Sequence, residues 1–268
     1  MGEVWLAEHV LLRRPCAVKL IRPERLGDPQ ALPRFEREVQ VTATLSHPNT
    51  VEVYDYGHAD DGTFYYAMEY LPGQSLQELV TAEGPLEAGR AVHLLRQVCG
   101  ALSEAHAAGL VHRDIKPANV LVCERGGLRD VAKLLDFGLV RARGSGQGGE
   151  TLTEEGTIAG TPAYMSPEQA RGDAADTRSD LYSVGAVAYF LLTGEPPFVR
   201  DSAVQTMAAH LSDPVTPPGR QRSVPADLEA VVLRGLEKEP ARRFQSAEEL
   251  EQALARCAFP GGYHKERS

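Results

Sequence analysis

Residues 112–119 read HRDIKPAN, and 22 residues after Asp114 the triplet DFG follows at 136–138. Upstream, Ala17-Val18-Lys19 falls in a predicted strand and Glu38 in a predicted helix, while Ser166-Pro167-Glu168 lies about 30 residues downstream of DFG. Any one of these short stretches would occur by chance. Five of them in this order, each on its expected type of element, do not.

The first 70 residues are predicted to be rich in strands. Short runs of β-branched, aromatic and apolar residues, bounded by Gly, Pro or Asp, predict strands at Glu3–Glu8, Ala17–Ile21, Val51–Tyr56 and Phe64–Tyr70. Between the second and third strands, apolar residues at helical spacing predict a helix over Leu32–Leu45.

After the break at Leu71–Gly73 the pattern becomes helical. A stripe of apolar residues over Ala91–Ala105 ends at Gly109, and Asp180–Leu192 is apolar nearly all round, which is typical of a helix buried on every side. Shorter amphipathic helices are expected at Leu228–Leu236 and Ala247–Leu254. Strands first and helices later predict an α+β protein with two lobes.

Composition excludes several classes of protein. The net charge of −9 argues against bulk binding to nucleic acid or to an anionic membrane. The four cysteines are scattered and predict reduced thiols in a cytoplasmic protein. The longest nearly unbroken apolar run, Val184–Leu192, is far shorter than the roughly 20 residues that a membrane span needs, and we expect no signal peptide. The glycine-rich stretch Arg143–Glu150 predicts a flexible loop.

These motifs resemble the eukaryotic-type (Hanks-type) serine/threonine protein kinases, in their bacterial-like form, over essentially the whole chain. The resemblance implies a catalytic domain over 1–256, with a small antiparallel β-sheet lobe (1–70) that contains one helix and a larger, mainly helical lobe (71–256), followed by a short polar tail (257–268). It implies ATP-dependent phosphoryl transfer to Ser or Thr hydroxyls of protein substrates, with no nucleic acid partner.

The resemblance assigns the chemistry to a few side chains. Asp136 and Asn119 become the ligands of Mg²⁺ or Mn²⁺, because hard cations prefer oxygen ligands. Asp114 would accept the proton of the attacking hydroxyl, and Lys116 would place a cation beside the transferred phosphate, as in Ser/Thr rather than Tyr kinases. Thr161 would hydrogen-bond Asp114 and Lys116.

The nucleotide would lie between the lobes. The resemblance implies that Lys19 holds the α- and β-phosphates and that Glu38 holds Lys19. Taken alone, Lys19 could merely extend to solvent and Glu38 could be one more surface carboxylate. The expected adenine contacts are apolar side chains and two backbone segments: Val4, Ala17, Met68 and Leu121, with the backbones of Glu69 and Leu71.

Other residues are expected to be structural or regulatory. Asp180 would hold the backbone around His112 and Arg113, and Glu168 would form a buried ion pair with Arg243. An Arg beside the catalytic Asp is typical of kinases activated by phosphorylation, since a phosphate binds a guanidinium well. We hypothesise autophosphorylation at Thr153 or Thr157, which self-association would permit. The alternative is that these threonines are ordinary polar residues of a loop and are not phosphorylated.

The chain departs from the family at its start. Only the end of the glycine-rich loop is present, as Gly2-Glu3-Val4, and the first strand and two glycines of the pattern are missing. We expect Met1 to be an internal methionine of a longer kinase rather than the start of a truncated one. For the chain as written, we expect an exposed sheet edge and weaker ATP binding. Because of this loop, a non-catalytic pseudokinase or docking module is the alternative function. A small-molecule kinase is a weaker one, because Gly160-Thr161-Pro162 and Ser166-Pro167-Glu168 shape a peptide groove.

Overall fold

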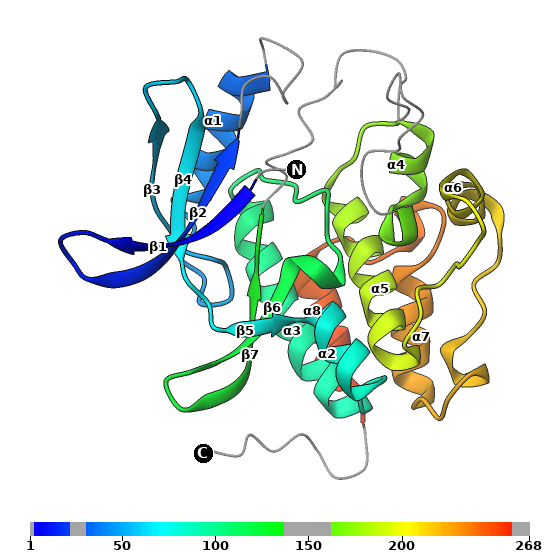
Figure 1. The fold of residues 1–268 in the computed structure, drawn as a ribbon. Helices are drawn as coiled ribbons and strands as arrows, with labels where there is room; N and C mark the ends of the chain where they lie inside the picture. The colour runs from blue at the N-terminus through cyan, green and yellow to red at the C-terminus, as the bar shows by residue number, and fades with distance from the viewer. Residues whose placement is uncertain (1–2, 22–30, 137–161, 259–268) are drawn as a thin grey trace.

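The computed structural model describes residues 3–21, 31–136 and 162–258 (Figure 1). Its N-terminal lobe is a four-stranded antiparallel sheet with the order β1-β2-β4-β3. The strands are β1 (Glu3–His9), β2 (Arg14–Ile21), β3 (Val53–His58) and β4 (Phe64–Glu69). All four predicted strands are therefore confirmed, to within a few residues at their ends.

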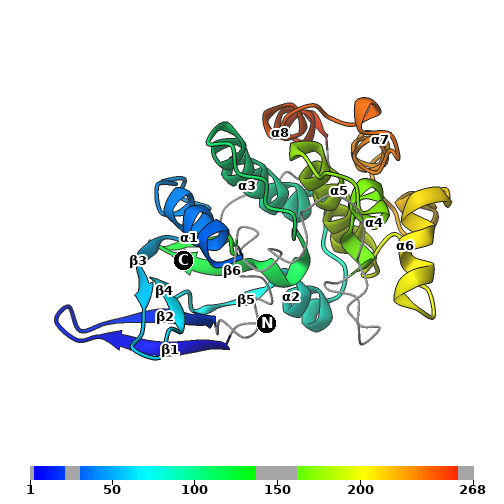
Figure 2. The same ribbon diagram turned by 90° about the horizontal axis from the view of Figure 1, so that it is seen from above.

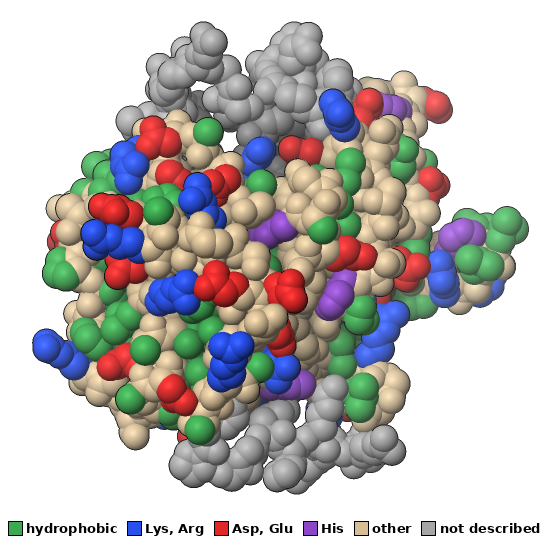
Figure 3. All heavy atoms as spheres, turned by 180° about the vertical axis from the view of Figure 1, so that it is seen from behind, with side chains coloured by type: hydrophobic (Ala, Val, Ile, Leu, Met, Phe, Trp, Pro, Cys, Tyr) green, Lys and Arg blue, Asp and Glu red, His purple; other side chains and the backbone are tan. Residues whose placement is uncertain are grey.

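Among the described strands, β1 lies at one edge of this sheet. Trp5 and Leu6 on this strand are more than half exposed. The hairpin between β1 and β2 projects from the molecule and carries three exposed apolar residues at 10–12 (Figure 3).

The predicted helix of the N-terminal lobe is α1 (Ala31–Thr42), which lies against the sheet (Figure 2). Val39 on this helix is fully buried against Phe64, Tyr66 and Met68 of β4 and Ile21 of β2. These contacts fix α1 against β2 and β4, the two strands that carry Lys19 and Tyr66.

The C-terminal lobe is mainly helical. Its helices are α2 (Leu76–Glu83), α3 (Ala88–Ala107), α4 (Pro167–Arg171), α5 (Thr177–Thr193), α6 (Ala203–Ser212), α7 (Ala226–Gly235) and α8 (Ala247–Arg256). A three-stranded antiparallel sheet lies against them, built from β5 (Gly73–Ser75), β6 (Val120–Arg125) and β7 (Leu128–Leu134). The sequence patterns predicted α3, α5, α7 and α8, but not α2, α4, α6 or this second sheet.

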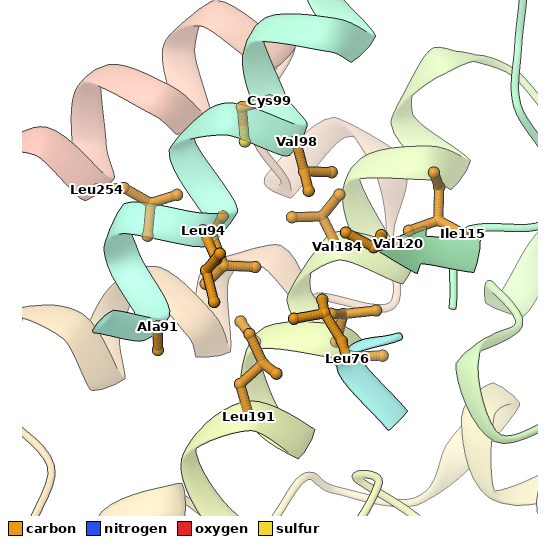
Figure 4. Close-up of a cluster of buried hydrophobic side chains, with 14 of the residues drawn as sticks. Leu76, Ala91, Leu94, Val98, Cys99, Ile115, Val120, Val184, Leu191 and Leu254 are labelled. Carbon is orange, nitrogen blue, oxygen red and sulfur yellow. The ribbon is translucent and has the colours of Figure 1, made fainter. Parts of the chain in front are cut away.

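Helix α5 lies at the centre of the C-terminal lobe, and Ser179–Leu192 is buried along its whole length. Apolar side chains from α3, α5, α8 and β6 meet in the core around it (Figure 4). Cys257, which we placed in a polar tail, packs in this core instead, because α8 ends at Arg256 and the next side chain turns inward.

The two lobes are joined by more than the connection between β4 and β5. Thr50 forms a parallel bridge with Leu134 of β7, and the backbones of Asn49, Val51 and Leu134 exchange hydrogen bonds of 2.7 and 3.0 Å. The segment that follows α1 is therefore fixed to the second sheet. Asp136 comes two residues after the end of β7 and contacts Lys19 of the N-terminal lobe.

Candidate active site

The segment after α3 brings three expected catalytic side chains together. The Lys116 ammonium donates to Asp114 Oδ2 at 2.7 Å, and Asn119 Nδ2 donates to the same oxygen at 3.0 Å and to the Asp114 carbonyl at 2.8 Å. These contacts arise because a short 3₁₀ helix (Pro117–Asn119) turns the chain back over Asp114. The result is a carboxylate held by two donors.

The backbone that carries Asp114 is held from α5, as the sequence predicted. The two Asp180 oxygens accept hydrogen bonds from the backbone N–H groups of His112 and Arg113, each at 2.8 Å. Asp180 is fully buried, and His106 Nε2 lies 2.8 Å from its Oδ2. Arg113 adopts a positive φ of 63°, which is costly for a side chain other than glycine and needs such support.

Across the site, Lys19 and Asp136 form an ion pair. Lys19 Nζ lies 2.6 Å from Asp136 Oδ2, and Lys19 is only 5% exposed although it is charged. Burial opposes ionisation of Asp136, but the Lys19 ammonium and the hydrogen bonds lower the pKa of this carboxyl below its ordinary value. The pair is thus a charged one in a largely buried setting.

Tyr66 is a member of this site that sequence reasoning missed. Its hydroxyl donates to Asp136 Oδ1 at 2.6 Å, so that both oxygens of the carboxylate have a donor. Burial, together with the nearby Asp136 charge, raises the pKa of Tyr66 well above its ordinary value and keeps the phenol protonated. From the sequence alone, an aromatic residue among apolar neighbours in a strand is predicted to be a core residue. The role of Tyr66 beside Asp136 becomes visible only from the strand register, which sets Tyr66 opposite Lys19.

The expected pairing of Glu38 with Lys19 is not among the contacts of the described residues. Glu38 Oε1 lies 3.8 Å from Arg113 Nη1 instead, while Lys19 is held by Asp136. The prediction depended on the rotation of α1, and in this structure α1 presents Glu38 to the catalytic loop rather than to β2.

The predicted adenine contacts come from strands of both lobes. Ala17 is opposite Met68 in the pairing of β2 with β4; Met68 belongs to the core of the N-terminal lobe, and Ala17 and Leu71 pack against that core. Leu121 lies on β6, and Val4 lies opposite Lys19 on β1 and is more than half exposed.

One backbone group of Glu69 already has a partner within the protein. Its backbone N–H donates to the Glu52 carbonyl at 2.9 Å, so a ligand contact would have to use its carbonyl. Its side chain is buried and accepts hydrogen bonds from Lys133 and Arg125, a function the sequence analysis did not foresee.

The ion pair predicted within the helical lobe is present. Arg243 donates to both oxygens of Glu168, at 2.7 and 2.8 Å, and the Ser179 hydroxyl adds a third donor at 2.6 Å. Burial would raise the pKa of Glu168, but these hydrogen bonds lower it to about 2. This pair anchors α4, on which the Ser166-Pro167-Glu168 motif lies.

The oxygen atoms of Asn119 and Asp136 are suitable ligands for a hard divalent cation. Because Asn119 Nδ2 donates to Asp114, its Oδ1 is the atom left for a ligand. The Leu135 N–H donates to the Asn119 carbonyl at 2.9 Å, which places Asp136 beside Asn119. An amide oxygen and an ionised carboxylate are ligands that Mg²⁺ prefers.

Several expected residues lie outside the described residues. These are Thr161 and the proposed phosphorylation sites Thr153 and Thr157, together with the glycine-rich stretch Arg143–Glu150.

Comparison with known proteins agrees with this geometry. The family model described as protein kinase domain matches residues 1–254. The chain is 44% identical over 257 residues to the serine/threonine-protein kinase pkn3 of Myxococcus xanthus, covering 95% of this chain and 47% of that protein. It is 43% identical over 260 residues to the serine/threonine-protein kinase PknB of Mycobacterium tuberculosis, covering 96% and 41%.

A solved structure is similar as well. The crystal structure of a double mutant of the Mycobacterium tuberculosis PknI kinase domain matches with a TM-score of 0.74 at 30% identity, covering 95% of this chain and 90% of that one. The chain spans less than half the length of the curated relatives named above. Among the described residues, no helix is both long and apolar enough to cross a membrane.

Proposed function

Because this chain belongs to the protein kinase domain family, we propose that it transfers the γ-phosphoryl group of ATP to serine or threonine hydroxyls of protein substrates. The observation that supports this most is the convergence of Asp114, Lys116 and Asn119 next to the Lys19–Asp136 pair. The relatives named above are serine/threonine-protein kinases, which supports the class of acceptor.

Asp114 is the proposed base. Its Oδ2 accepts hydrogen bonds from Lys116 and Asn119, so the carboxylate cannot turn away from an incoming hydroxyl. It would orient that hydroxyl and accept its proton as the bond to phosphorus forms. Lys116 would place its charge beside the transferred phosphoryl group, where negative charge is held by equatorial oxygens.

Lys19, Asp136 and Asn119 would hold the triphosphate. Asp136 and Asn119 would bind Mg²⁺ or Mn²⁺, which when bound supplies positive charge beside the phosphate oxygens. Lys19 would contact the α- and β-phosphates. The adenine would lie between Ala17 and Leu121, with Met68 behind it, because a flat ligand with few polar groups suits a largely apolar site.

Arg113 is the proposed point of control. It lies 3.8 Å from Glu38 in this structure, so a phosphate on Thr153 or Thr157 would compete with Glu38 for the guanidinium. Release of Glu38 would let it pair with Lys19. Two copies of the chain would phosphorylate each other, and the proposed location of this activity is the cytoplasm, where ATP is supplied.

The proposal is tested with the purified chain, Mg²⁺ and ATP labelled on the γ-phosphate. We expect phosphate on serine or threonine, and a loss of at least about 100-fold in Asp114→Asn, because a positioned base contributes about 10²–10⁴-fold. Asp201→Asn, which changes an exposed carboxylate between α5 and α6, is the matched control and should transfer like the wild type.

Nucleotide binding separates this function from the pseudokinase alternative. If the wild type binds ATP with Mg²⁺ but transfers nothing, the chain is a docking module. If the wild type and Asp114→Asn incorporate phosphate equally, another base or a contaminating kinase is responsible. Mass mapping of the product decides whether Thr153 or Thr157 is modified.

A further inference from the structure

The peptide groups on either side of Arg113 are both held by side chains from other elements. The Arg113 N–H donates to Asp180 on α5, and the Arg113 carbonyl accepts a hydrogen bond from Gln169 Nε2 on α4 at 2.9 Å. Arg113 has the left-handed backbone described above and directly precedes Asp114. The position of Asp114 therefore depends on both of these contacts.

The Gln169 amide serves two partners at once. Its Oε1 accepts from the Ser166 N–H at 3.0 Å and from the Ser166 hydroxyl at 3.1 Å, which caps the N-terminus of α4. Its Nε2 is then directed at Arg113. Either Glu or Gln can close such a capping box, but only Gln has a donor left for a second partner.

Helix α4, which carries Gln169, is held in place by contacts of its other residues. The neighbouring residue Glu168 is buried and bound by Arg243 through two hydrogen bonds, and by Ser179 through a third. Ser166, at the other side, is fully buried. The backbone that carries Gln169 is therefore restrained, and a residue that positions another group needs such a restrained backbone.

The geometry points to Gln169 as a positioning residue for the catalytic loop, which transmits the fixed position of α4 to Asp114 through the Arg113 carbonyl. This inference rests on the proposed function, because it takes Asp114 as the base. The competing explanation is that Gln169 only caps α4, as Glu78 caps α2 in another capping box.

The substitution Gln169→Glu separates the two explanations. A glutamate keeps the acceptor that Ser166 needs but has no donor for Arg113, and its charge faces the carbonyl. We expect kcat for phosphoryl transfer to fall about three- to tenfold, the effect of one lost hydrogen bond, with an unchanged KM for ATP. Glu78→Gln makes the reverse exchange in the capping box of α2, on an exposed side chain, and should leave kcat unchanged.

Hydrogen exchange supplies a readout that does not depend on activity. The N–H groups of His112 and Arg113 are protected by Asp180, so loosening of the loop should speed exchange in a peptide that covers 110–116. We expect faster exchange in Gln169→Glu and wild-type exchange in Glu78→Gln. Gln169→Leu, which removes both the cap and the donor, should exchange at least as fast as Gln169→Glu.

Wild-type kcat and wild-type exchange in Gln169→Glu would overturn the inference, because the cap alone would then suffice. A loss of kcat with unchanged exchange in 110–116 would overturn it too. If the wild-type chain transfers no phosphate, the proposed function fails, while the exchange experiment still decides whether Gln169 holds the loop.

Discussion

His210 shows how a single buried side chain depends on its surroundings in the helical lobe. It is fully buried on α6, and its Nδ1 lies 2.8 Å from the Tyr182 hydroxyl. Its ring is nearly perpendicular to that of Phe198, with 4.9 Å between the ring centroids. Lys238 lies over the same Phe198 ring, 4.4 Å from its centroid. Burial, assisted by the Lys238 charge, lowers the pKa of His210 to about 4.

This shift predicts a dependence of stability on pH. Because the pKa of His210 is lower in the folded chain than the ordinary value of 6.5, the unfolded chain binds a proton first as the pH falls. The free energy of unfolding should therefore decrease between pH 6.5 and pH 4, by up to about 1.4 kcal/mol per pH unit from this group. His210→Gln should remove that contribution, as measured by urea unfolding at several pH values.

The exposed His9, on the β1–β2 hairpin, provides the matched substitution His9→Gln, which controls for the loss of one histidine. Parallel plots of unfolding free energy against pH for the wild type and His210→Gln would contradict the prediction.

The site residues differ in how far the sequence could predict them. Lys19 and Asp136, 117 positions apart, were expected to meet because their motifs fix both on known elements, and they do. Tyr66 could not be foreseen, because its hydroxyl binds Asp136, and that contact depends on how the two sheets are placed relative to each other. The pairing of Glu38 with Lys19 stays a prediction: in this structure Glu38 lies near Arg113, and its partner depends on how α1 is oriented, which the sequence does not fix.

Among the elements, the crossing of α5 and α7 depends on two glycines. A Cβ added at Gly185 would lie 3.1 Å from the backbone carbonyl carbon of Gly235 and 3.3 Å from its Cα. The apolar pattern of α5 predicted a fully buried helix, and the structure confirms this. The pattern could not predict the glycine contact, because it depends on a helix some 50 residues further along the chain.

We expect Gly185→Ala to destabilise the fold, although alanine normally favours a helix interior by about 0.5–1 kcal/mol over glycine. The added methyl group meets backbone, which can yield only by moving α7, and overpacking of this kind costs about 1–3 kcal/mol. Chemical denaturation measures the difference.

Gly100→Ala in α3 is the useful comparison. There the added Cβ would lie 2.8 Å from the His47 ring, which is a side chain and can rotate. Its cost should be smaller than that of Gly185→Ala. The opposite order would show that the α5–α7 contact adapts more easily than the His47 site.

The second sheet shows where patterns of apolar residues fail at this scale. Strand β5 has only three residues and includes Gly73, which sequence reasoning took for a break between the lobes. A Cβ at Gly73 would lie 2.4 Å from the Val122 carbonyl oxygen, so the glycine is needed for close strand pairing. A strand this short has too few residues to establish an alternation.

At the scale of the whole molecule, one buried carboxylate helps to join the lobes. Glu69, at the end of β4, accepts hydrogen bonds from Lys133 on β7, from Arg125 on β6 and from the Glu52 N–H. Burial opposes its ionisation, but the hydrogen bonds from Lys133 and Arg125 lower the pKa of Glu69 below its ordinary value. Lys133 also donates to the Thr50 carbonyl at 3.0 Å, beside the bridge between Thr50 and Leu134.

Lys133→Met should therefore weaken the junction far more than Arg125→Met, although both remove a cation from the same carboxylate. Lys133 is only 4% exposed. Its loss removes a donor from the buried Glu69 carboxylate and from the Thr50 carbonyl, and breaking a buried ion pair in this way typically costs about 3–5 kcal/mol of stability. The side chain of Arg125 is about half exposed, so its ion pair contributes about 0–1 kcal/mol. Urea unfolding of the two variants measures these costs.

Adding Glu69→Gln to Lys133→Met should recover part of the loss, because the unpaired charge is then removed. Equal costs for the two single variants would show that the lobes are held by backbone contacts and the apolar core, and not by this ion pair.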